Sequence, residues 1–245
     1  VACFVYRRLI ASHVELMGSG AVPGISSALD AVSKDELRDA VAALPAEIRL
    51  KLSKALKLQS GPTQTLVQRT PSAAELLSSI HSGEKSCVAV CKDLFARIMQ
   101  VDNQLKACVE VLDASALRLA AEVDNKVKEG SKLRPLEGLP ILVKANIDLE
   151  GTLSTASTPG LKNWRPRTSA PCVVKLLEAG AIVIAKTNLP ELALRFDGYN
   201  KVHGMCRNPY ALEHSPGGSS SGTAVGIASG MAPAGLGSDT GGSLR

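Results

Sequence analysis

The chain has 245 residues, of which 45% are hydrophobic and 21% charged, so it can bury a core of ordinary globular size. Aromatic residues make up 3%, the net charge is +5 and no basic run is present, which argues against nucleic-acid binding by stacking or by a basic surface. The six cysteines form no C-x-x-C pair and four histidines are present, so we expect no metal, no other cofactor, no disulfide framework and a reducing, cytoplasmic compartment.

Residues 1–69 are predicted to form a helical extension ahead of the main domain. Ser33–Glu36 has the pattern of a capping box, and apolar residues then recur at helical spacing. Residues 60–63, Ser-Gly-Pro-Thr, are a turn signal, so a second domain is expected over 70–245. The sequence has no apolar run long enough to cross a bilayer, although a membrane anchor or targeting segment before residue 1 stays open.

The first half of this domain has the periodicity of three helices. A second capping box begins at Ser72 and opens the first helix, and apolar spacing predicts two more over 86–101 and 114–128. Cys87 and Cys91 lie four positions apart, so both are expected on one helix face as small buried residues.

The second half alternates strands and helices. Residues 141–143 and 181–185 are continuous apolar runs, which are typical of buried strands. A helix capped by Ser169 separates them, and another helix is predicted over 221–229. A strand–helix–strand unit predicts parallel pairing, and therefore an α/β fold with helices on both sheet faces.

Three separated segments carry residues suited to acyl transfer. Lys144 ends the apolar strand of Gly138–Lys144, where partial burial lowers the pKa of an amine and lets its neutral form act as a base. Gly217–Gly222 and Gly241–Arg245 supply glycine-flanked serines, and the first loop runs into a helix N-terminus that favours an anion. A nucleophilic hydroxyl, a relaying hydroxyl and an amine form such a site without histidine, provided that the segments meet in space.

Other interpretations of these segments are weaker. Ser220 is the centre of a Gly-x-Ser-x-Gly nucleophile elbow, but no histidine follows it in this sequence. Gly235–Gly241 approaches the dinucleotide-binding fingerprint with the wrong spacing. A flexible linker is a further interpretation of Gly217–Gly222, weakened by the apolar helix that follows.

Several short motifs stand in a fixed order along the domain. They are Leu139-Pro-Ile-Leu-Val-Lys144, Ala179-Gly-Ala181, Lys186-Thr-Asn-Leu-Pro-Glu-Leu192, Arg207-Asn-Pro-Tyr210, Pro216-Gly-Gly-Ser219 and Gly237-Ser-Asp-Thr-Gly-Gly-Ser243. With these motifs, from about Ser72 to Arg245, the chain resembles the first half of an amidase signature family enzyme. Ser219 follows Lys144 by 75 positions and precedes Ser243 by 24, separations which that family shows. The resemblance implies the fold of the family, with a mixed central sheet and helices on both faces.

The resemblance also implies roles for single residues. Ser243 would attack the amide carbonyl, Ser219 would relay its proton after a cis peptide bond at Gly218, and Lys144 would be the base. The backbone around these serines would form the oxyanion hole and bind substrate, and three side chains would brace the loop. The backbone positions are Thr240, Gly241, Gly242, Gly217 and Gly218, and the bracing side chains are Ser220, Asp239 and Arg245. Ala145 departs from the acidic residue that usually follows the lysine, and Ser221 stands where glycine is commoner.

The expected activity is hydrolysis of a small-molecule carboxamide through an acyl-serine intermediate. Thr155–Pro159 and Ala232–Gly237 resemble the small aryl-amide branch, which includes indoleacetamide and mandelamide hydrolases. A fatty-acid-amide-type hydrolase, the amidase subunit of glutamyl-tRNA(Gln) amidotransferase and a non-catalytic fragment remain open alternatives, as does a homodimer. Because the sequence stops just after Ser243, we expect this piece alone to be poorly stable, with apolar surface uncovered.

Overall fold

A computed structural model describes residues 66–245, which form one compact unit. The predicted helical extension over residues 1–69 lies outside the described residues except for its last four positions. The capping box at Ser33 belongs to that part of the chain.

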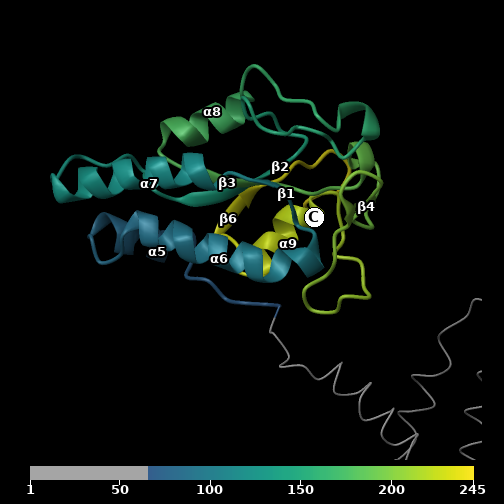
Figure 1. Cartoon of the computed structure of the whole chain (residues 1–245), viewed down its shortest axis with the longest axis horizontal. Helices are drawn as coiled ribbons and strands as arrows, with labels where there is room; N and C mark the ends of the chain where they lie inside the picture. The colour runs from purple at the N-terminus through teal and green to yellow at the C-terminus, as the bar shows by residue number, and fades with distance from the viewer. Residues whose placement is uncertain (1–65) are drawn as a thin grey trace, which may run out of the picture. The chain divides into compact units, whose positions relative to one another are not determined.

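A four-stranded mixed sheet forms the centre of the unit (Figure 1). Its strands are β1 (Cys108–Val111), β2 (Pro140–Lys144), β3 (Ile182–Thr187) and β6 (Ala234–Leu236). They lie in the order β1-β3-β2-β6, with β2 parallel to β3 and β6, and β1 antiparallel to β3. The predicted parallel crossover and the mixed α/β class are confirmed, whereas β1 and β6 are strands that the sequence did not predict. A separate two-stranded ladder joins β4 (Tyr199–Asn200) to β5 (Gly204–Met205).

The helices predicted within residues 70–245 are all present. The helical elements are α5 (Ala73–His81), α6 (Cys87–Leu105), α7 (Asp113–Lys128), α8 (Pro171–Glu178) and α9 (Ser221–Ala228), with 3-10 turns η1 (Pro159–Leu161) and η2 (Glu191–Ala193). The capping box of α5 forms as predicted, because Ser72 Oγ accepts from the Glu75 N–H and Glu75 Oε2 accepts from the Ser72 N–H. None of the helices within residues 66–245 is both long and apolar enough to cross a membrane.

The predicted cap of α8 is wrong. Ala170 is the N-cap residue, and Pro171 begins the helix with its backbone angle already fixed. Ser169 Oγ instead accepts a hydrogen bond from the Glu150 N–H, which ties the start of the helix to the loop after β2.

Side chains of β2 alternate between two apolar cores. Ile141 and Val143 pack on the same side as Val173 of α8, whereas Leu142 packs with residues of α6, α7 and α9. Figure 1 shows α8 and α9 on opposite sides of the sheet, so the predicted covering of both faces is confirmed. Lys144 follows Val143, and alternation directs its side chain toward α9.

A buried carboxylate fixes the turn that leads into β2. Glu137 is 1% exposed and pairs with the Arg134 guanidinium and with Lys126 Nζ at 3.0 Å. The Arg134 guanidinium is the main reason why the pKa of Glu137 falls to about 2. Arg134 also donates to the carbonyls of Leu177 and Glu178, so the end of α8 is anchored at this turn.

The cysteines within residues 66–245 are free thiols, and three of the five are buried. Cys87 and Cys91 are both 0% exposed on α6, which confirms their predicted burial. The five cysteines among residues 66–245 are unpaired, and no cluster of three or more His, Cys, Asp or Glu in that range could hold a metal ion.

Candidate active site

Lys144 is a buried amine at the carboxyl end of β2. Four apolar residues precede it in the strand, and its side chain is 0% exposed. Burial removes water from the charged form and lowers the pKa of Lys144 to about 8, while the Asp239 carboxylate acts in the opposite direction. Such an amine can be neutral near physiological pH.

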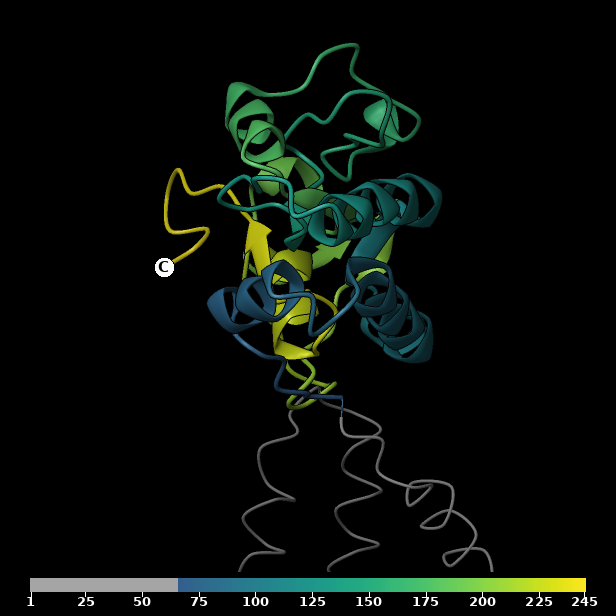
Figure 2. The ribbon, with the colours of Figure 1, turned by 90° about the vertical axis from the view of Figure 1, so that its left-hand side faces the viewer.

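Two serine hydroxyls continue from this amine in a row. Lys144 Nζ lies 2.7 Å from Ser219 Oγ, and Ser219 Oγ lies 2.9 Å from Ser243 Oγ. The peptide bond between Gly218 and Ser219 is cis. The structure therefore brings together the end of β2, the loop before α9 and the loop after β6. Figure 2 shows this last loop running outside the sheet toward the C-terminus.

A buried amide network fixes the start of α9. Asn188 Oδ1 accepts from the Leu189 N–H, from Asn200 Nδ2 and from Ser157 Oγ, and the Asn188 carbonyl accepts from the Gly222 N–H. Because Asn188 follows β3 directly, the sheet holds the helix that begins after Ser219.

We predict that Gly222→Ala destabilises the protein, although glycine to alanine in a helix ordinarily stabilises by about 1 kcal/mol. A Cβ at this position would lie 2.3 Å from the Ala107 carbonyl oxygen and 2.4 Å from Asn188 N. Both atoms are backbone, so relief requires α9 to move, at a cost of about 2–3 kcal/mol or more. Urea unfolding measures the change.

Gly160→Ala is the matched control for that substitution. It adds the same methyl group in η1, where nothing lies within 4 Å of the new Cβ. Its free energy of unfolding should stay within about 0.5 kcal/mol of wild type. Equal effects of the two substitutions would contradict the close packing of α9 on Asn188.

The loop that carries Ser243 is braced by a carboxylate. Asp239 accepts from the N–H groups of Gly242 at 2.7 Å and Leu244 at 3.1 Å, and from Arg245 Nε at 3.0 Å. The Arg245 guanidinium is the main reason why the pKa of Asp239 lies below its ordinary value. Ser220 Oγ donates to the Ser238 carbonyl and accepts from the Ser238 N–H, so it fastens the same loop to α9.

The predicted oxyanion-hole donors divide into two groups. The Gly242 N–H already donates to Asp239 Oδ1 and is not free to bind a substrate oxygen in this conformation. Among residues 66–245, no acceptor is found for the N–H groups of Thr240, Gly241 and Ser243. Gly217 and Gly218 lie on the other serine loop, where the Gly217 carbonyl accepts from Ser221 Oγ at 2.8 Å.

Two residues that sequence reasoning missed also meet at this site. Lys144 Nζ lies 3.0 Å from Ser238 Oγ, and Asn146 Nδ2 donates to the same oxygen at 3.2 Å. A signal existed, since polar residues just after parallel strands collect at one sheet edge. To use that signal for Ser238, one must first predict strand β6, which ends directly before Gly237 and Ser238.

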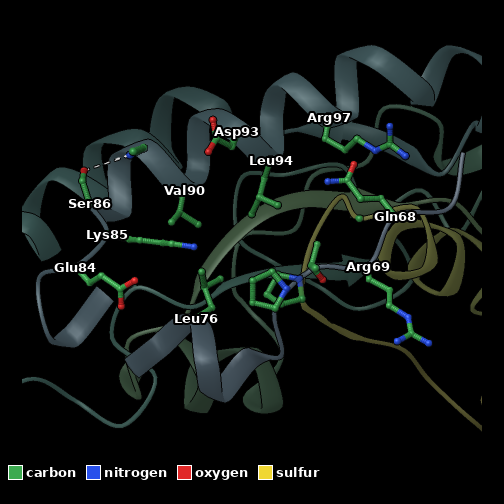
Figure 3. Close-up of a pocket in the computed structure, with 15 residues that line it drawn as sticks. Gln68, Arg69, Leu76, Glu84, Lys85, Ser86, Val90, Asp93, Leu94 and Arg97 are labelled. Carbon is green, nitrogen blue, oxygen red and sulfur yellow. Dashed lines mark hydrogen bonds between the residues drawn. The ribbon is translucent and has the colours of Figure 1, made fainter. Parts of the chain in front are cut away.

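A cavity of about 470 Å³ lies elsewhere in the unit. Figure 3 shows the apolar Leu76, Val90 and Leu94 along it, together with the charged Lys85 and Asp93. None of the residues of the Lys144–Ser219–Ser243 row lines it, so this cavity does not lie beside Ser243.

Comparison with known proteins identifies a large group of relatives. The Amidase family model matches residues 89–245. The A subunit of glutamyl-tRNA(Gln) amidotransferase from Carboxydothermus hydrogenoformans is 42% identical over 174 residues, which cover 71% of this chain and 36% of that protein. The corresponding protein of Endomicrobium trichonymphae is 37% identical over 171 residues, covering 70% of this chain and 35% of that protein. The chain thus spans about a third of the length of these curated relatives.

Solved structures show the same relationship. The native peptide amidase of Stenotrophomonas maltophilia matches with a TM-score of 0.62 and 36% identity, covering 66% of this chain and 34% of its own. A structure described as fatty acid amide hydrolase matches with a TM-score of 0.68 and 31% identity, covering 71% of this chain and 31% of its own.

Proposed function

The chain belongs to the Amidase family, and on that premise we propose that it carries the acyl-transfer apparatus of an enzyme that hydrolyses a carboxamide C–N bond. The observation that carries the proposal is the hydrogen-bonded row Lys144–Ser219–Ser243, with distances of 2.7 and 2.9 Å. These distances allow a proton to pass from the outer hydroxyl to the amine without a histidine.

In the first step, Ser243 Oγ attacks the amide carbonyl carbon. Its proton passes to Ser219 Oγ, and the proton of Ser219 passes to the neutral Lys144 Nζ. A carbon–oxygen bond forms, and the carbonyl π electrons move to the substrate oxygen. The N–H groups of Thr240, Gly241 and Ser243 are the donors proposed to stabilise that oxyanion.

In the second step, the tetrahedral intermediate collapses and the C–N bond breaks. Lys144 returns its proton through Ser219 to the leaving nitrogen, which departs as ammonia or an amine. Water then attacks the acyl-serine by the same relay, and the carboxylic acid leaves as Ser243 recovers its proton. No step requires a metal or a cofactor.

The substrate class that we propose is a small or aryl carboxamide. Apolar side chains that follow β3 remain exposed, with Leu192 at 50%, Leu194 at 77% and Phe196 at 59%. The backbone of Phe196 lies against Gly218, because a Cβ on that glycine would lie 3.2 Å from Phe196 Cα. These exposed apolar side chains beside the serine loop suit a substrate with an apolar acyl group. A long-chain amide is the extreme form of such a substrate.

The amidotransferase subunit is a second candidate function, favoured by the curated relatives at 37% to 42% identity. In that role the same serine would release ammonia from glutamine, and a partner protein would receive it. The helical extension predicted over residues 1–69 is not expected of that subunit. Substrate preference therefore separates the two functions.

The proposal predicts that the purified full chain releases ammonia from a small arylacetamide. The assay compares indoleacetamide, a long-chain fatty amide and glutamine at equal concentration, with ammonia quantified enzymatically. Preference for indoleacetamide supports the first function, and preference for glutamine supports the second. Release of ammonia from none of the three amides would contradict both proposed functions.

A further inference from the structure

The Lys144 amine has a second hydroxyl beside it that the proposed proton relay does not use. Ser238 Oγ lies 3.0 Å from Nζ, on a different segment from Ser219 Oγ. Lys144 has a flexible four-carbon stem and is 0% exposed, so bulk water does not hold its amine in place. Two hydroxyl oxygens therefore fix the position of Nζ.

Ser238 is itself fixed from two directions. Asn146 Nδ2 donates to its Oγ at 3.2 Å, and Ser220 Oγ donates to its carbonyl at 3.2 Å. The register of the parallel pair, in which Val143 lies opposite Leu236, places Asn146 and Ser238 at the same edge of the sheet. Ser238 thus connects Lys144 and Asn146 at the end of β2 with Ser220 at the start of α9.

We propose that Ser238 and Asn146 are positioning residues for the general base, with Ser238 Oγ holding the Lys144 amine against Ser219 and Asn146 holding Ser238. This inference rests on the proposed acyl-transfer function. When Lys144 takes up a proton, its ammonium gains a third N–H. Ser238 Oγ then accepts one of the three, while the Lys144 side chain itself is 0% exposed.

The role has a defined electrostatic consequence. Hydrogen bonding to the charged form of a group favours that form, so loss of the Ser238 hydroxyl should lower the Lys144 pKa below its value of about 8. A carboxylate in place of the Asn146 amide should raise it. The other charge that acts on the amine is Asp239, which is paired with Arg245. Lys186 on β3 lies beside Val143, so its side chain leaves the opposite face of the sheet, where its Nζ donates to the Ile147 carbonyl and Ser154 Oγ.

The test is an NMR titration of the lysine amines in the full chain, with the Lys144 signal assigned by its loss in Lys144→Met. We expect Ser238→Ala to move the Lys144 midpoint down by about 0.5–1 pH unit and Asn146→Asp to move it up by a similar amount. Ser238→Thr, which keeps the hydroxyl, should restore the wild-type midpoint. The acid limb of kcat/KM for amide hydrolysis should move in the same directions, with kcat lower in Ser238→Ala.

A purely structural role for Ser238 would lower thermal stability in Ser238→Ala without lowering the Lys144 midpoint. A Lys144 midpoint within about 0.2 unit of wild type in Ser238→Ala, or in Asn146→Asp if Ser238→Ala does not fold, would overturn the inference. Asn146 is exposed, so its variant keeps the test available if Ser238→Ala does not fold. A chain whose midpoints shift as expected but which hydrolyses no amide would contradict the proposed function and leave the positioning role supported.

Discussion

Replacing Ser243 by alanine is expected to lower kcat for amide hydrolysis by roughly 10⁴-fold to 10⁶-fold, the range found when a catalytic serine is removed. The residue stands at the outer end of the row, 2.9 Å from Ser219 Oγ, and is half-buried. Without that oxygen no acyl-serine bond forms. Steady-state ammonia release measures the loss, and mass spectrometry of the quenched protein detects the acyl adduct in wild type.

Folding must be preserved for this loss to be informative. The substitution removes one neutral hydrogen bond, which is worth about 1 kcal/mol, so the unfolding midpoint should change little. Ser131→Ala is the matched control, because Ser131 is exposed in the turn after α7 and forms no side-chain hydrogen bond among residues 66–245. Turnover by Ser243→Ala at the level of Ser131→Ala would exclude Ser243 as the nucleophile.

Periodicity predicted the helices well, because each carries an apolar face or a cap of its own. The exception in extent is α6, which continues to Leu105 although 101 was the expected end. Lys106, in a left-handed conformation, ends it, and the Asp102 carboxylate accepts from the Ala107 N–H at 2.6 Å. Neither the left-handed Lys106 nor the hydrogen bond from Ala107 to Asp102 corresponds to a helix-stop pattern in the sequence.

The two missed strands depend on pairing more than on composition. β1 has four residues, one of them Glu110, and it is defined by its antiparallel contact with β3. β6 is Ala-Gly-Leu, which has weak strand propensity and pairs because β2 offers its free edge. Tertiary context therefore decides both elements.

The candidate site was predictable where a motif carried it and not where contacts alone define it. Lys144, Ser219 and Ser243 lie in three motifs, and the structure brings all three together. Ser238 lies in the same motif as Ser243, yet its contact with the amine depends on β6 lying beside β2. The hydrogen bond from the Gly242 N–H to Asp239 likewise depends on how the loop turns. The sequence does not show this turn, and the resemblance therefore assigned that N–H to the oxyanion hole.

The second large effect is expected at Lys144. Its pKa of about 8, compared with an ordinary 10.5, leaves about one amine in ten neutral at pH 7, where an unperturbed lysine would have about one in three thousand. Because the neutral amine is the proposed base, kcat/KM should fall about tenfold for each pH unit below 8 and level off above it. Lys144→Met should lose this acid limb and about 10²-fold to 10⁴-fold in plateau activity.

Lys186→Met is the control that makes the assignment specific. Lys186 is also 0% exposed, and burial lowers its pKa to about 8 as well. Its Nζ donates to the Ile147 carbonyl at 2.5 Å and to Ser154 Oγ at 3.1 Å, on the side of the sheet away from the serines. Because Lys186 has the same lowered pKa but does not contact the two serines, Lys186→Met should leave the midpoint of the acid limb near pH 8, even if it weakens the fold. An acid limb that vanishes in Lys186→Met and persists in Lys144→Met would move the general base from β2 to β3, and the row of two serines would then have no amine to receive its proton.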